Sequence, residues 1–217
     1  MLMETFETLR TFRTSLYRCF DRRVDALFEL TDAVLTAGAV PSSAHLSLEP
    51  VHRRGWGSLY AALNRGRIDE GAVRGLLARH PLLSDEGRAT PVYAVDQSVW
   101  SRCDAESSPE RGFYYHPSRH SAGQPIVAGW AYQWIAQLGF ARESWVAPMD
   151  VRRVHPTENT NAVAAQQIKA LLCCLPTASS ARGKPPLIQF LIGPRSCQLP
   201  VRGTACWHIP SHAIGRL

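Results

Sequence analysis

Residues 92–100 read VYAVDQSVW, and this stretch decides the fold. Its first four residues are apolar or aromatic, and valine and tyrosine are favoured in strands. An aspartate follows directly. We therefore expect a buried strand over residues 92–95 that ends at Asp96. From spacing alone, a carboxylate in this position is either a metal ligand or a strand-end acceptor of backbone hydrogen bonds.

The residues that follow alternate between strand and helix patterns. Strands are expected over 112–115, 126–138 with a bend at Gly129, 144–149 and 187–192. A helix is expected over 159–175, with Asn159 or Thr160 as its cap. Three or four antiparallel strands, a helix and a further strand is the opening order of an RNase H-like fold. The fold class is therefore α/β (α+β), with a mixed sheet.

Upstream, apolar residues recur three or four positions apart, which is typical of amphipathic helices. One or two helices are expected over residues 4–35, and a helical pair over 56–81. Ser58 is predicted to cap the first helix of that pair, and Asp69 the second.

The helical pair is open to two interpretations. It is either a plain helical hairpin or a helix-turn-helix that contacts DNA phosphates. In the second case the contacts come from arginines on the pair, namely Arg65, Arg67, Arg74 and Arg79.

Composition narrows the class of protein. The chain of 217 residues is 45% hydrophobic and 19% charged, which is globular, and its apolar runs are far shorter than the roughly 20 residues of a membrane span. With no secretory signal, its six cysteines are expected to be free thiols in a cytoplasmic protein. The formal charge of +6 lies entirely in residues 159–217, because residues 1–158 balance their acids and bases. That basic segment can add affinity for nucleic acid.

A resemblance to a known family rests on an extended pattern. The run YAVDQSVWSRCDAESSPERGFYYHPSRHSAGQPIVAGWAYQWIAQLG, followed by SWVAPMDVRRVHP and NTNAVAAQQI, resembles the start of the catalytic domain of DDE-type insertion-sequence transposases. WGSLYAALNRGRID resembles the helical region before that domain. The resemblance covers roughly residues 50–175.

The resemblance implies a chemistry. Such enzymes cut and join DNA with two divalent cations, Mg²⁺ or Mn²⁺, held by three carboxylates from separate elements. Asp96 matches the first of these, as catalytic residue and metal ligand. The polar segment after it implies further DNA contacts, from Arg102, Arg111, Arg119 and His120. The implied partners are the DNA ends of an insertion element and a second copy of the chain.

The chain departs from the family pattern at its C-terminal side. The second carboxylate should follow the strand after the helix, and the third should come later, yet no acid follows Glu158. We therefore expect an incomplete RNase H-like domain from a truncated or frameshifted transposase that is inactive alone. The expected organisation is a helical region at 1–83, a linker at 84–91, the partial catalytic domain at 92–192 and a poorly ordered, non-native tail at 193–217.

Two other functions stay open. Cys206-x-His208-x-x-x-His212, with Cys197 and Cys173-Cys174 nearby in sequence, offers zinc ligands at a spacing that is not a standard finger. Alternatively, the chain is a non-catalytic DNA-binding module or regulatory fragment, which would bind DNA without magnesium.

Overall fold

The computed structural model describes residues 2–80, 91–115, 125–139, 145–175 and 189–192. The chain divides into two compact units, Met1–Leu76 and Leu77–Leu217, and each is described by itself. The expected tail at 193–217 and all but the last residue of the expected linker lie outside the described residues. Among the helices of the described ranges, none has the length and apolar character needed to cross a membrane.

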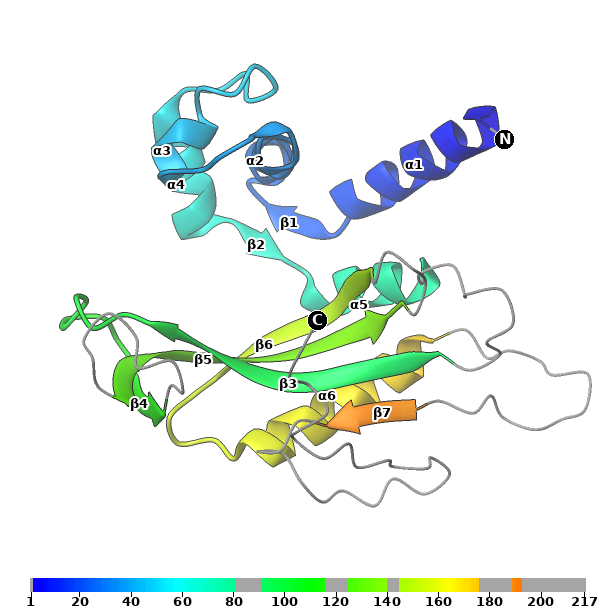
Figure 1. Ribbon diagram of the computed structural model, residues 1–217. Coiled ribbons are helices and arrows are strands. Elements are labelled where there is room, and N and C mark those ends of the chain that lie inside the picture. Colours follow the sequence, from blue (N-terminus) through cyan, green and yellow to red (C-terminus); the bar gives the residue numbers. More distant parts are fainter. Residues whose placement is uncertain (1, 81–90, 116–124, 140–144, 176–188, 193–217) are drawn as a thin grey trace, which may run out of the picture. The chain divides into compact units, whose positions relative to one another are not determined.

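The first unit consists of helices and one short two-stranded sheet (Figure 1). Its elements are α1 (Leu2–Tyr17), β1 (Phe20–Arg22), α2 (Val24–Thr36), α3 (Ser43–Leu46), α4 (Trp56–Arg65) and β2 (Arg67–Ile68), and α5 (Glu70–Arg79) runs across the boundary into the second unit. Helices α2, α3 and α4 enclose a small core in which Ala33 and Leu59 are fully buried. The helices predicted over residues 4–35 are confirmed as α1 and α2.

The caps of the helical pair were predicted with mixed success. Asp69 caps α5 as predicted, because its Oδ1 accepts a hydrogen bond from the Ala72 N–H at 2.9 Å. Ser58 does not cap α4, since that helix begins at Trp56 after Gly55 and has no side-chain cap. Glycine is tolerated at the cap position, so the helix starts three residues earlier than a cap at Ser58 predicts.

The connection between α4 and α5 is a strand. β2 pairs antiparallel with β1, so that Phe20 lies opposite Ile68 and Arg22 opposite Arg67. A side chain at Gly66 would collide with the Ala62 carbonyl oxygen, so glycine lets the chain turn tightly off α4 into β2. Neither a plain helical hairpin nor a simple helix-turn-helix describes this arrangement.

The second unit is a five-stranded sheet with helix α6 (Thr160–Cys174) on one face (Figure 1). The strands are β3 (Val92–Ser101), β4 (Gly112–Tyr115), β5 (Ile126–Leu138), β6 (Val146–Val154) and β7 (Gln189–Ile192). β5 pairs with β3 along one edge and with β4 and β6 along the other, and β7 pairs with the free edge of β3. Only the β3–β7 pair is parallel, so the sheet of the described residues is mixed, as predicted.

Element bounds in this unit agree with the prediction for β4, β5 and α6, and Asn159 is the cap of α6. Its Oδ1 accepts from the Asn161 and Ala162 N–H groups. Two strands are longer than predicted, because β3 continues past Asp96 to Ser101 and β6 continues to Val154. Both extensions pair with β5, and their backbone N–H and C=O groups form hydrogen bonds with those of β5. Such backbone pairing does not depend on an apolar pattern of side chains, so the pattern did not predict these extensions.

Gly129 is required where β5 passes β3. It pairs with Ser101, and a Cβ there would collide with the Trp100 carbonyl oxygen, which belongs to the rigid backbone of the neighbouring strand. We expect Gly129→Ala to lower the free energy of unfolding by about 1–3 kcal/mol, as overpacking does, measured by urea denaturation. The matched control is Gly112→Ala, which lies opposite Gly129 and whose Cβ would meet only the end of the Tyr114 side chain. Equal losses in the two variants would contradict the assignment.

A buried tyrosine makes stability depend on alkaline pH. Burial raises the pKa of the Tyr93 phenol above its ordinary value of 10.0. Above pH 10 the unfolded chain releases this proton while the folded chain retains it, so the stabilisation is complete below pH 10 and declines as the pH rises toward the folded value. We expect the thermal midpoint of Tyr93→Phe to fall less steeply with pH above 10 than that of the wild type. Parallel pH profiles would show that this phenol is not responsible.

Candidate functional site

Asp96 lies in the middle of β3, not at its end. Its neighbours Tyr93 and Val95 pack into the core that α6 covers, with Ile135 of β5. Successive side chains of a strand point to opposite faces, so Asp96 faces away from α6, and it is exposed. The prediction that the strand ends at Asp96 was wrong, because the chain keeps its pairing with β5 for five more residues.

The environment of the carboxylate is sparsely polar. Asp96 Oδ1 accepts a hydrogen bond from the Gln97 N–H at 2.8 Å, and its cross-strand partner is Trp134. The Trp134 indole donates to Ser98 Oγ at 2.8 Å, not to the carboxylate. Among the described residues no cation pairs with Asp96, so the carboxylate keeps acceptor capacity for a ligand.

A parallel strand ends beside Asp96. Ile192, the last residue of β7, pairs with Val95, the residue directly before Asp96. In a parallel pair both strands run in the same direction. β7 therefore runs toward the level of Asp96 along β3 and ends one residue short of it. The sequence continues as Gly193-Pro194-Arg195, without an acid. Those residues lie outside the described part of the chain.

Three of the described acids that follow Asp96 in this unit are bound elsewhere. Asp104 pairs with Arg102 at 3.2 Å, and this hydrogen bond lowers the pKa of Asp104 below its ordinary value. Asp150 accepts from the Gln167 amide of α6 at 3.0 Å, on the face opposite to that of Asp96. Glu158 accepts from Arg152 and from the His155 N–H.

The described residues do not assemble the three-carboxylate metal centre of the family that the chain resembles. In the part of the chain that the structure describes, no group of three His, Cys, Asp or Glu side chains could hold a metal ion. Two divalent cations need more oxygen ligands than one carboxylate supplies, and among the described residues Asp96 belongs to no group of three such side chains. The proposed zinc ligands Cys197, Cys206, His208 and His212 lie outside the described residues. Cys173 and Cys174, at the end of α6, are free thiols.

The predicted DNA-contacting side chains fall into three groups: exposed arginines of the first unit, residues outside the described part of the chain, and arginines that bind other groups of the protein. Arg65 and Arg67 are exposed at the end of α4 and on β2, and no acid in the described residues pairs with them. Arg119 and His120 lie outside the described residues.

Arg102 and Arg111 have roles within the protein. Arg111 donates from Nη1 to the carbonyl oxygens of Arg102 and Cys103 at 2.9 and 3.3 Å. The Arg102 guanidinium, besides pairing with Asp104, lies over the rings of Trp100 and Trp130 at 5.6 and 5.8 Å. Such contacts hold the loop between β3 and β4, and they leave these guanidinium groups only partly available to an anion.

Sequence reasoning missed two features. Arg153 of β6 lies over the Trp130 ring at 5.1 Å and donates to the Pro109 carbonyl oxygen, which extends the group of arginines and tryptophans. The second feature is a set of three arginines around β1, in the run Arg18-Cys-Phe-Asp-Arg22-Arg23. The pairing of β1 with β2 places this run beside the segment that contains Arg65 and Arg67. The density of arginine in that run is the signal that could have found them.

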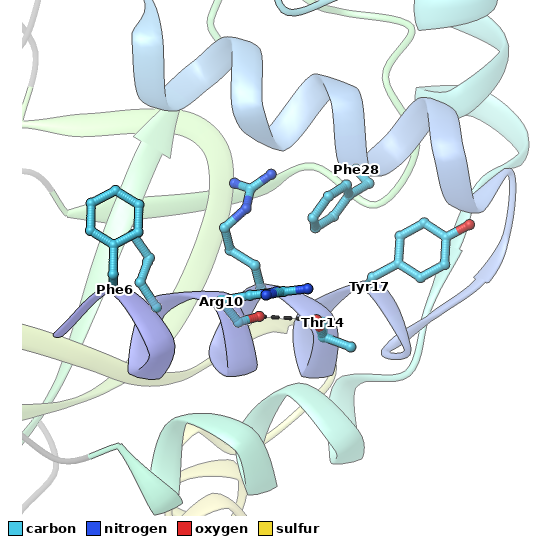
Figure 2. A pocket seen from close by; sticks show the side chains of 7 residues that line it. Phe6, Arg10, Thr14, Tyr17 and Phe28 are labelled. Atoms are coloured by element: carbon cyan, nitrogen blue, oxygen red, sulfur yellow. Dashed lines mark hydrogen bonds between the residues drawn. The ribbon is translucent and has the colours of Figure 1, made fainter. Parts of the chain in front are cut away.

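A groove of about 480 Å³ lies in the first unit, between α1 and α2 (Figure 2). Figure 2 shows Phe6 and Tyr17 of α1 at its two ends and Phe28 of α2 beside Tyr17. Leu9, Arg10, Arg13 and Thr14 complete its lining. It contains no acid and no nucleophile other than a threonine hydroxyl that donates to the Arg10 carbonyl oxygen, so it is not a candidate for catalysis.

Comparison with known proteins gives one match. The model of a family described as DDE superfamily endonuclease matches residues 15–189, which is most of the chain. The matched segment runs from the end of α1 to the first residue of β7, so it covers most of the helical unit as well as most of the sheet. No curated protein and no solved structure matches the chain.

Proposed function

Because the chain belongs to the DDE superfamily endonuclease family, we propose that Asp96 is the first of the family's three catalytic carboxylates and that this chain alone does not cut DNA. Membership confirms the predicted α+β, RNase H-like fold. It also makes the chain a member of a nuclease family whose enzymes act on DNA and use divalent metals. The assignment of Asp96, the inactivity and self-association into a dimer are the proposal.

One observation carries the role of Asp96. It is an exposed carboxylate on β3, the strand that lies between antiparallel β5 and parallel β7, next to the point where β7 ends. A second carboxylate placed just after β7 would reach the same edge of the sheet, and two oxygens from adjacent strands are what a shared cation needs.

The inactivity rests on the absence of that second carboxylate from the sequence. No Asp or Glu follows Glu158 anywhere in the chain. Two divalent cations beside a single carboxylate would carry a large uncompensated charge, so their binding is weak. We attribute residues 193–217 to a shifted reading frame. Translation of the DNA downstream of the Leu172 codon in all three frames should yield, in another frame than that of residues 193–217, an aspartate directly after the β7 strand and later a helix-borne glutamate.

Manganese binding tests the assignment of Asp96. We expect Mn²⁺ to broaden NMR signals of residues around Asp96 only at concentrations above about 1 mM, the weak end of protein calcium sites. Asp96→Asn should abolish this broadening, whereas Asp21→Asn, at an exposed acid of the first unit, should leave it unchanged. Broadening that persists in Asp96→Asn would remove Asp96 from the metal site.

A cleavage assay tests the inactivity. With 10-fold excess protein over a linear DNA duplex and millimolar Mg²⁺ or Mn²⁺, no strand cleavage is expected from the wild type or from Asp96→Asn. Cleavage that a chelator stops and that Asp96→Asn lacks would support the role of Asp96 and overturn the inactivity. Cleavage that Asp96→Asn retains would overturn the role of Asp96.

The unpaired arginines favour a second candidate, a DNA-binding module that does not cut. Arg65 and Arg67 are exposed, and no acid in the described part of the chain pairs with them, so they are suited to phosphate contacts. This function requires that DNA binding persists when a chelator removes all divalent cations. Loss of binding on addition of the chelator would exclude it.

A further inference from the structure

Five arginines gather around the two-stranded sheet of the first unit. β1 and β2 lie side by side (Figure 1), and Arg22 is the register partner of Arg67, next to an irregularity in the pairing between Phe20 and Arg22. Arg18 precedes β1, Arg23 follows it, and Arg65 precedes β2 across a single glycine. All five side chains are exposed, and we call this set the arginine ribbon.

The arginine ribbon is electrostatically uncompensated. None of its five guanidinium groups forms an ion pair or hydrogen bond with another described residue, whereas Arg13 and Arg54, in the same unit, pair with Asp32 and Glu29. Residues 18–23 and 65–69, which contain the ribbon, include two acids. Asp21 is exposed, and the Asp69 carboxylate caps α5. Five cations against two acids leave the ribbon positively charged.

The pairing of Arg22 with Arg67 works against folding. Like charges on facing positions of an antiparallel pair destabilise it. The pairing is irregular between Phe20 and Arg22, and strands of three and two residues have few other contacts to offset the repulsion. Arg23 adds a local cost, since it adopts the left-handed conformation at φ 59° and ψ 35°, which a non-glycine residue rarely occupies. The like-charged pair and the left-handed arginine both cost stability without an evident stabilising contact in return. Such unfavourable features are typical of functional sites.

We propose that the arginine ribbon binds the phosphate backbone of double-stranded DNA. Long arginine side chains on a narrow, exposed ribbon can each reach a phosphate and pair with two of its oxygens. Contacts of this kind position a protein on the duplex without reading its sequence. The choice of DNA as the polyanion rests on the proposed function, whereas the charge and geometry of the ribbon are independent of Asp96.

The test compares two double variants that remove equal charge. Arg22→Gln/Arg67→Gln neutralises the cross-strand pair. Arg10→Gln/Arg53→Gln is the control, because both of its arginines are exposed in the same unit but outside the ribbon, and Glu29, which Arg53 contacts at 3.7 Å, keeps its closer ion pair with Arg54 at 3.4 Å. Binding of the full chain to a fluorescent 30-base-pair duplex is measured by anisotropy, with a chelator present and over a range of salt concentrations.

The ribbon variant should lose two phosphate contacts. The slope of log affinity against log salt should become shallower by about 1.8, because each contact contributes about 0.9, while the control retains most of the wild-type slope. The thermal midpoint of the ribbon variant should be unchanged or higher, since the repulsion between Arg22 and Arg67 is relieved. A purely structural role would lower that midpoint instead.

Several results would overturn the proposal. Equal losses in the ribbon and control variants would mean that net charge alone attracts DNA, and unchanged binding in the ribbon variant would place the contacts elsewhere. Ribbon-dependent binding to an RNA duplex or to anionic lipid vesicles, but not to DNA, would assign another partner. Asp96→Asn should bind as the wild type in this metal-free assay, so failure of the ribbon and failure of the proposed role of Asp96 are separate outcomes.

Discussion

Replacing Tyr93 by alanine should lower the free energy of unfolding of the sheet unit by about 3–5 kcal/mol, the usual cost of removing a buried aromatic ring. Tyr93 is 1% exposed and stacks on Phe190 of β7, with their ring centroids 5.5 Å apart. It also belongs to the core that α6 covers. Its loss therefore weakens both the attachment of β7 to β3 and the packing of the helix.

Hydrogen exchange measures this effect most directly, because a chain with two compact units need not unfold in one step. Amides of β3, β7 and α6 should lose protection by the same amount in Tyr93→Ala. Tyr93→Phe, which keeps the ring, should retain most of the protection at neutral pH. If protection in β7 survives the alanine substitution, the parallel pairing of β3 with β7 does not depend on this ring.

Replacing Leu59 by alanine should lower the free energy of unfolding of the first unit by about 2–5 kcal/mol. Leu59 of α4 is fully buried and packs with Leu30 of α2 and Leu46 of α3. A cavity there loosens the packing of α2 against α4, the two helices whose ends adjoin β1 and β2. DNA affinity through the arginine ribbon should therefore fall at temperatures where this unit begins to unfold.

Leu63→Ala is the matched control, since Leu63 lies on the same helix and is 55% exposed. Its effect on stability should stay within about 0.5 kcal/mol, as is usual for surface positions. Circular dichroism during heating and anisotropy with the DNA duplex should separate the two variants. Similar losses from both would show that α4 does not bury the face that contains Leu59.

Periodicity and turn chemistry determined much of the fold. The apolar alternation of residues 126–138 predicted β5, and the cap Asn159 with the apolar spacing after it predicted α6 within a residue at each end. The order of these elements indicated a mixed, RNase H-like sheet, because local patterns of this kind express which face of each element is buried. The sequence also singled out Asp96 and showed that no acid follows Glu158.

Only the tertiary structure decided which groups meet. β3 extends beyond Asp96 because ten of its residues pair with β5, and that pairing depends on a strand about thirty residues away. Arg102 and Arg111 bind a nearby carboxylate, carbonyl oxygens and tryptophan rings. Arg22 and Arg67 are brought together by the pairing of β1 with β2, and neither pairs with an acid among the described residues. The sequence gives the type of each side chain. The partners of a side chain depend on backbone hydrogen bonds between distant segments, and local spacing does not predict which segments pair.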